Sequence, residues 1–310
     1  MKKFMIRFRG VRGSFPVPGV DTLKIGGNTS CVEFRIGNAI VIIDAGTGII
    51  SLGEDLLKEH FSTGKPVVAT LLFSHMHHDH NQGFSFFKPA YLGSSILYMF
   101  GPTMFEKSME EMLSQVMRPP FSPVRLEDLN SQRFLYNLRG PEEILIDPET
   151  GKAFSRNIHH EPPIPNKDMI RIFVQKDYAH PVNGVLFYRV EWQGKKVVYA
   201  SDTEGYVGGN QKLIKFAKDA DVLIHDAQYY MDNEYADIAT SKQGYGHSSP
   251  EMAVEVARKA NARQLVLYHH DPSHNDQKIK EKEKDVQKLF PNTIAAYEGL
   301  VIHLMAQEAA

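Results

Sequence analysis

Three histidines and one aspartate form the pattern His-x-His-x-Asp-His in the segment His75-Met76-His77-His78-Asp79-His80. They directly follow an apolar run, residues 66–73, which predicts a buried strand. Imidazole nitrogens and carboxylate oxygens are ligands that zinc, manganese and iron accept in proteins. An ordinary loop has no need of so many such groups within six residues. The pattern therefore predicts a dinuclear metal site at the carboxyl end of a strand.

The composition is that of an ordinary globular protein, with 310 residues, 42% of them hydrophobic and 23% charged. The formal net charge of −2 gives no electrostatic footprint for nucleic acid. Cys31 is the one cysteine, which excludes an intramolecular disulfide and fits a reducing compartment. The N-terminal residues 1–9 lack the apolar core of a signal peptide, and no apolar run is long enough to cross a membrane. We therefore expect a cytoplasmic protein without membrane contact.

Strand-like runs and helical periodicities follow one another along the chain without a clean linker or an internal repeat. We therefore expect a single domain over residues 1–310. Apolar spacing predicts a helix over residues 103–117, and the Lys- and Glu-rich residues 275–289 predict a solvated helix. Residues 139–168 hold five prolines with little periodicity, which predicts a loop-rich insertion. Its role is left open between a lid and an oligomer contact. Further strands are predicted over residues 170–174, 185–192, 196–200, 221–225 and 264–268.

Further metal ligands are expected where strands end, because side chains there are free to converge. His180 precedes a predicted strand, Asp202 follows one directly, and His269 ends another. Each of the three taken singly is as readily structural as metal-binding, but donors at successive strand ends favour a common site. His270 stands beside His269, so the last ligand is one of these two. We choose His269 by its position.

This order of motifs resembles the metallo-β-lactamase fold superfamily, over residues 44–269. The resemblance implies an α/β (α+β) protein with a four-layer αββα sandwich. Asp44-Ala45-Gly46 resembles the superfamily's Asp-x-Gly turn, whose carboxylate supports the metal loop from behind the ligands. The cofactors expected are two divalent metal ions, with zinc ahead of manganese and iron.

The metal ligands are assigned to two ions that share a hydroxide and together clamp phosphoryl oxygens. His75, His77 and His180 are expected to hold one ion. The ligands expected for the other ion are Asp79, His80 and His269, with Asp202 bridging both.

Within the superfamily, the chain resembles the phosphodiesterase branch of tRNase Z-like nucleases and related cyclic-nucleotide enzymes. His225-Asp226-Ala227 is similar to that branch's His-Glu-Ala-Thr loop, and Gly246-His247-Ser248-Ser249 to its Gly-His-Ser-Thr loop. The resemblance implies that His247 protonates the leaving group and that Asp226 orients it. The chain departs from the pattern with Asp226 in place of glutamate and Gln228 in place of threonine. It also lacks the glycine-rich, basic arm that clamps tRNA.

Three functional hypotheses follow from these motifs. The leading one is a metal-dependent phosphodiesterase acting on a small phosphodiester, such as a cyclic nucleotide, or on RNA, with Asp79, Asp226 and His247 as catalytic residues. The second is hydrolysis of a thioester, lactone or β-lactam on the same dinuclear site, which does not need the Asp226 and His247 loops. The third is a metal-binding sensor or assembly module without turnover. A homodimer is left open, as is a helix-capping role for His247.

Overall fold

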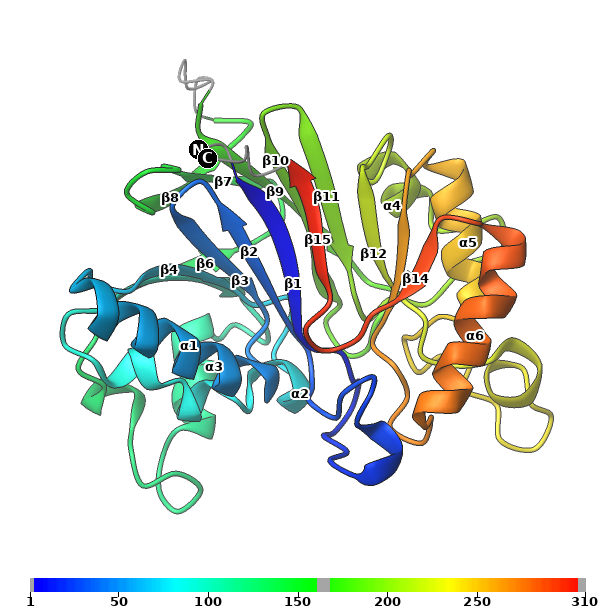
Figure 1. Ribbon diagram of the computed structural model, residues 1–310, viewed down its shortest axis with the longest axis horizontal. Coiled ribbons are helices and arrows are strands. Elements are labelled where there is room, and N and C mark those ends of the chain that lie inside the picture. Colours follow the sequence, from blue (N-terminus) through cyan, green and yellow to red (C-terminus); the bar gives the residue numbers. More distant parts are fainter. Residues whose placement is uncertain (1–2, 161–167, 306–310) are drawn as a thin grey trace.

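Two mixed β-sheets form the centre of the computed structural model, which describes residues 3–160 and 168–305 (Figure 1). The first sheet has the strand order β15-β1-β2-β3-β4-β5-β6. Its strands are β1 (Phe4–Gly10), β2 (Cys31–Ile36), β3 (Ala39–Ile43), β4 (Val68–Leu72), β5 (Ile96–Pro102), β6 (Gln132–Leu138) and β15 (Val301–Met305). The second sheet has the order β14-β13-β12-β11-β10-β9-β7-β8. Its strands are β7 (Glu142–Ile146), β8 (Ala153–Asn157), β9 (Ile170–Asp177), β10 (Val185–Trp192), β11 (Lys195–Ala200), β12 (Val222–Asp226), β13 (Leu265–Tyr268) and β14 (Thr293–Ala295).

Helices cover the outer face of each sheet (Figure 1). α1 (Gly48–Thr63) and α3 (Met109–Val116) pack on the first sheet. The second sheet is covered by α4 (Gln211–Phe216), α5 (Pro250–Lys259) and α6 (Asp276–Leu289). The short helix α2 (His78–Asn81) lies below the strands, near the centre of Figure 1. The layers helix, sheet, sheet and helix confirm the predicted αββα sandwich.

The main hydrophobic core lies between the two sheets, and each sheet also buries its outer face under helices. In β3, Val41 and Ile43 point into the core between the sheets, whereas Ile40 and Ile42 pack with α1. Because both faces of such a strand are buried, its sequence is continuously apolar instead of alternating. This is why residues 39–43 are an uninterrupted apolar run and why residues 66–73 are apolar except for the buried Thr70.

Parallel strands bring several chain segments to one edge of the sandwich. β11, β12 and β13 are parallel neighbours, so their carboxyl ends meet at the same edge of the second sheet. β3, β4 and β5 are parallel neighbours in the first sheet. α2 follows β4 at the edge where β11 to β13 end (Figure 1). This edge is where the predicted ligands of both sheets are expected to meet.

Two expectations about elements differ from the structure. Residues 139–168, predicted to be loop-rich, contain β7 and β8, which pair antiparallel, and β7 also pairs with β9. The short apolar run Ile144-Leu145-Ile146 is buried and drives this pairing despite the prolines around it. Residues 161–167 of that segment lie outside the described residues.

The helix predicted over residues 103–117 begins only at Met109. Ser108 Oγ accepts a hydrogen bond from Glu111 N at 3.2 Å, and the Glu111 carboxylate accepts one from Ser108 N at 2.7 Å. This capping box fixes the start of α3. The Ser-x-x-Glu signature was present in the sequence and gives the correct boundary.

Candidate metal centre

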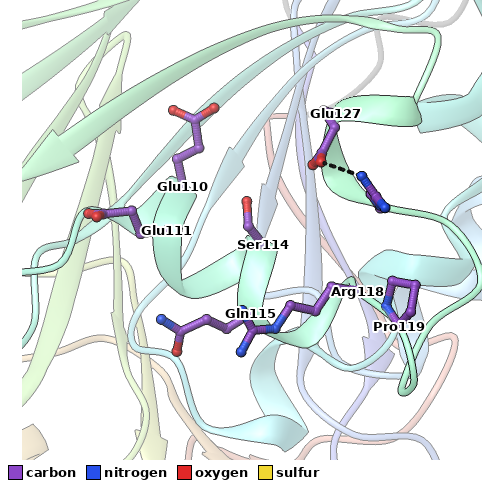
Figure 2. A pocket seen from close by; sticks show the side chains of 8 residues that line it. Glu110, Glu111, Ser114, Gln115, Arg118, Pro119 and Glu127 are labelled. Carbon is purple, nitrogen blue, oxygen red and sulfur yellow. Dashed lines mark ion pairs between the residues drawn. The ribbon is translucent and has the colours of Figure 1, made fainter.

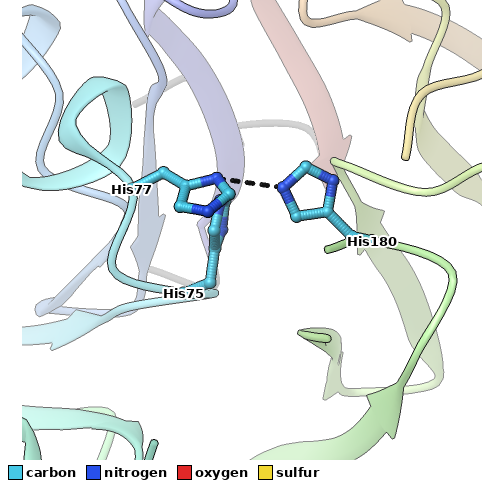
Figure 3. Close-up of side chains that lie close together, drawn as sticks. All are labelled: His75, His77 and His180. Atoms are coloured by element: carbon cyan, nitrogen blue, oxygen red, sulfur yellow. Dashed lines mark hydrogen bonds between the residues drawn. The ribbon is translucent and has the colours of Figure 1, made fainter. Parts of the chain in front are cut away.

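Three imidazoles from both sheets converge at the edge of the sandwich (Figure 3). His75 and His77 lie between β4 and α2, and His180 lies in the turn between β9 and β10. His180 Nε2 is 3.0 Å from His77 Nδ1. His75 Nε2 is buried and has no hydrogen-bond partner among the described residues. A buried polar atom without a partner is costly, and a metal ion at this point would satisfy it.

A second group lies beside the first and consists of Asp79, His80, Asp202 and His269, whose ligand atoms all lie within 4.8 Å of one another. His80 Nε2 is 3.2 Å from His269 Nε2 and 3.2 Å from Asp202 Oδ1. Asp79 Oδ2 is 3.1 Å from His269 Nε2. This set of two imidazoles and two carboxylates matches the donor types that first-row divalent metals bind.

Asp202 faces both groups. Its Oδ1 lies near His80 and His269, while its Oδ2 is 3.7 Å from His75 Nε2 and 3.7 Å from His180 Nε2. Asp202 lies two residues after the end of β11 and has a φ of +54°, a backbone conformation that L-residues rarely adopt. The strand end thus places one carboxylate where its two oxygens point to different imidazole groups.

The electrostatics of the cluster suit a cation. Burial, together with neighbouring His80, lowers the pKa of His75 well below its usual value, so this imidazole is neutral and free to act as a ligand. Burial also acts to lower the pKa of His80, but Asp202, Asp79 and Asp44 raise it well above its usual value. The carboxylates therefore favour positive charge at this point, and the residues present fit two divalent ions.

Asp44 supports the segment from Ser74 to His80, here called the metal segment, through hydrogen bonds. Its Oδ1 accepts a hydrogen bond from Ser74 N at 2.7 Å. Its Oδ2 accepts hydrogen bonds from Ser74 Oγ at 2.8 Å and Tyr199 Oη at 2.7 Å, and lies 2.8 Å from His80 Nδ1. This contact places the proton of His80 on Nδ1 and leaves Nε2 free to face the centre. That Asp44 supports metal ligands stays a prediction, for which these contacts give the geometry.

His247 and Asp226 form a buried pair next to the second group. His247 Nδ1 lies 2.7 Å from Asp226 Oδ2. Burial acts to lower the pKa of His247, but the Asp226 carboxylate raises it to about 9. The His247 ring also stacks on His269, with centroids 4.9 Å apart. A protonated imidazole held by a carboxylate at a metal centre is equipped to donate a proton from its other nitrogen.

The structure also separates residues that the sequence left undecided. His269 lies in the second ligand group, whereas His270 Nε2 is turned toward the Ala296 carbonyl oxygen at 2.9 Å. His269 Nδ1 lies 2.9 Å from Gln228 Oε1, so Gln228 orients this imidazole. Ser14 N donates a hydrogen bond to Asp79 Oδ2 at 2.8 Å. No motif in the sequence indicates these two supporting contacts.

Lys282 of the charged helix α6 is buried and reaches the loop after β12. Its Nζ donates hydrogen bonds to the carbonyl oxygens of Ala227 at 2.9 Å and Gln228 at 3.0 Å. A signal for its burial was available, because Lys282 shares one helix face with the buried Ile279 and Val286. The expectation that the whole charge run is solvated is therefore wrong at this residue.

A separate cavity of about 670 Å³ lies on α3 and the loop that follows it (Figure 2). Its lining combines acidic and basic side chains, including Glu110, Glu111 and Arg118. None of the predicted metal ligands lines it. This cavity is therefore distinct from the metal centre.

The αββα fold and the cluster of metal-binding side chains are typical of metal-dependent hydrolases, and the sequence comparisons support the same class. Residues 40–270 match the beta-lactamase superfamily domain, and the chain belongs to this family. It is a metal-dependent hydrolase of the metallo-β-lactamase fold. No helix within residues 3–160 and 168–305 is long and apolar enough to cross a membrane.

Among individual relatives, the chain is similar to ribonuclease Z of Picrophilus torridus, with 25% identity over 304 residues, covering 88% of this chain and 87% of the relative. Ribonuclease Z of Thermoplasma acidophilum is 25% identical over 317 residues, covering 93% and 92%. The fold is similar to that of the metallo-β-lactamase fold protein YhfI from Bacillus subtilis, with a TM-score of 0.65, 18% identity and coverage of 97% and 99%. It is also similar to the short form of human tRNase Z, with a TM-score of 0.61, 18% identity and coverage of 97% and 100%.

Proposed function

We propose that this hydrolase is a phosphodiesterase that acts on RNA and uses two divalent ions, zinc foremost. The observation that carries the proposal is the His247–Asp226 pair beside the ligand groups. Breaking a phosphodiester releases a ribose alkoxide, which needs a proton, whereas the thiolate released from a thioester leaves without one. The ribonuclease Z relatives, which match over most of their length, support the same choice.

In this proposal, His75, His77 and His180 hold one ion, and Asp79, His80 and His269 hold the other. Two ions held there would supply an activated water molecule and neutralise charge on the phosphoryl oxygens. Asp202 fixes the spacing of the two groups, because its oxygens face both. His247 donates a proton from Nε2 to the leaving oxygen, and Asp226 keeps Nδ1 protonated and the ring oriented.

The test is a substrate panel for protein reconstituted with zinc, manganese or iron. The panel contains RNA with a 3′ extension, cyclic nucleotides, a lactone, a β-lactam and a thioester. We expect cleavage of RNA to have the highest kcat/KM and to be lost in Asp202→Asn, together with part of the bound metal. Faster hydrolysis of an acyl substrate than of any phosphodiester would reject the proposal, as would stoichiometric metal binding without turnover.

A further inference from the structure

A second cavity, of about 530 Å³, lies directly beside the metal centre. The segment from Tyr178 to Gly184, the turn from Glu204 to Tyr206, and Gly244 line it. His180 belongs to both sites: its Nε2 faces His77, while its Nδ1 lies 3.0 Å from the Gly246 carbonyl oxygen. The cavity is therefore only one imidazole ring away from the ligand groups. Its volume lies in the range of pockets that bind small organic groups, roughly 300–1,000 Å³.

Three large hydrophobic side chains that line this cavity are exposed to solvent. Tyr178 is 68% exposed, Val182 is 72% exposed and Tyr206 is 51% exposed. Exposed apolar surface gathered at one place next to a reaction centre is typical of a binding site. Two tyrosine rings at such a site offer flat faces against which a planar group can stack.

The charges around the cavity favour a base over a free phosphate inside it. No lysine or arginine is among the described residues that line it. Glu204, its one carboxylate, accepts hydrogen bonds from Tyr235 Oη at 2.6 Å and from the amides of Gly244 and Gly246. That carboxylate is thus engaged within the protein and would repel a phosphate placed in the cavity.

Two lysines lie over tyrosine rings at the cavity, one over Tyr178 of its lining and one over Tyr245 next to it. Lys176 Nζ lies 5.2 Å from the ring centroid of Tyr178, and Lys242 Nζ lies 5.3 Å from that of Tyr245, the residue after Gly244. Aromatic faces for bases together with cations for the backbone are the usual means of binding single-stranded nucleic acid.

We propose that this cavity binds the nucleobase of the nucleotide next to the scissile phosphate, stacked on Tyr206 and on the face of Tyr178 that Lys176 does not cover. The inference rests on the proposed function, because it assumes that a phosphodiester of RNA occupies the metal centre. A nucleobase site at this position implies that the substrate is a nucleic acid with an unpaired base next to the cleaved bond. A simple phosphodiester without a base would leave the cavity empty.

The test compares the binding of adenosine 5′-monophosphate and ribose 5-phosphate to zinc-loaded protein by calorimetry. We expect the nucleotide to bind about tenfold or more tightly, because stacking of one base on an aromatic ring gives an effect of this size. Tyr178→Ala and Tyr206→Ala should bring the ratio of the two affinities close to one, while Tyr206→Phe should retain it. Phe61→Ala, which removes a 73% exposed aromatic ring from α1, is the matched control and should keep the wild-type ratio.

Equal binding of the two compounds by the wild type, or an unchanged ratio in both alanine variants, would overturn the subsite. Methyl p-nitrophenyl phosphate has no base, so its turnover by the wild type reports on the proposed function separately. Base-dependent binding without turnover of either methyl p-nitrophenyl phosphate or RNA would reject the phosphodiesterase and keep the cavity as a nucleobase site. Turnover without base-dependent binding would reject the subsite alone.

Discussion

At the scale of residues, Asp44 connects the metal segment to both sheets. It accepts hydrogen bonds from Ser74 of the first half and Tyr199 of the second, and it fixes the ring of His80. Asp44 itself has a φ of +62°, and strained residues of this kind persist only where the surroundings hold them. We therefore propose that Asp44 orients a ligand and does not itself bind an ion.

Asp44→Asn should weaken metal binding about 10- to 100-fold, because an amide cannot accept all of these hydrogen bonds. The measurement is competition for zinc with a chromophoric chelator. Tyr199→Phe, which removes a single hydrogen bond to Asp44, is the control and should have a smaller effect. Unchanged zinc affinity in Asp44→Asn would contradict this role.

The pKa of His247 predicts the alkaline limit of activity. A general acid works only while it is protonated, so kcat/KM should fall as the pH rises through the pKa of about 9. In Asp226→Asn the carboxylate that raises this pKa is gone, so the fall should move to lower pH. The measurement is kcat/KM against pH for both proteins, with bound metal determined in each. An alkaline limb at the same pH in both proteins would show that another group is responsible.

At the scale of elements, α6 supports the loop that carries Asp226 and Gln228. Lys282→Met should leave the buried carbonyl oxygens of Ala227 and Gln228 unpaired. We expect a loss of about 1–3 kcal/mol in the free energy of unfolding, since buried acceptors without a donor are costly. Because Gln228 orients His269 and Asp226 orients His247, kcat should fall as well.

Chemical unfolding and steady-state kinetics measure these two effects. Lys284→Met, which replaces an exposed lysine of the same helix, is the matched control. The supporting role fails if Lys282→Met has the stability and kcat of Lys284→Met.

The elements that could be predicted from the sequence are those with a clear apolar run of their own. The apolar runs of β4, β12 and β13 were recognised because burial on both faces leaves no other pattern. The hairpin of β7 and β8 was missed because its apolar run is short and because β7 also pairs with β9, a partner that local composition does not reveal.

In the candidate metal centre too, some residues could be predicted from local sequence and others could not. Residues at strand ends, such as Asp202 and His269, were found, and their role as ligands stays a prediction. The contacts of Gln228 and Ser14 depend on how distant loops meet, and no spacing encodes them.

At the scale of the whole molecule, the proposed ligands come from both sheets. The segment from His75 to His80 follows β4 of the first sheet, whereas His180, Asp202 and His269 belong to loops of the second. Ions bound between them would link the two halves and bind only the folded state.

Removing the metal should therefore lower the melting temperature. A ligand present at 1,000 times its Kd stabilises a folded protein by about 4 kcal/mol. The measurement is thermal unfolding with zinc and after treatment with a chelator, and Asp202→Asn should show a much smaller difference. Equal melting temperatures of the wild type with and without metal would contradict a site shared by the sheets.

The central claim is that this metal centre, with His247 as its acid, cleaves phosphodiesters of RNA. It is tested most directly by kcat of His247→Ala relative to the wild type on two substrates with different leaving groups. For an RNA dinucleotide, whose ribose oxygen needs a proton, we predict a loss of about 10²–10⁴-fold. For methyl p-nitrophenyl phosphate, whose nitrophenolate leaves unaided, we predict little loss. An equal loss on both substrates would contradict the claim.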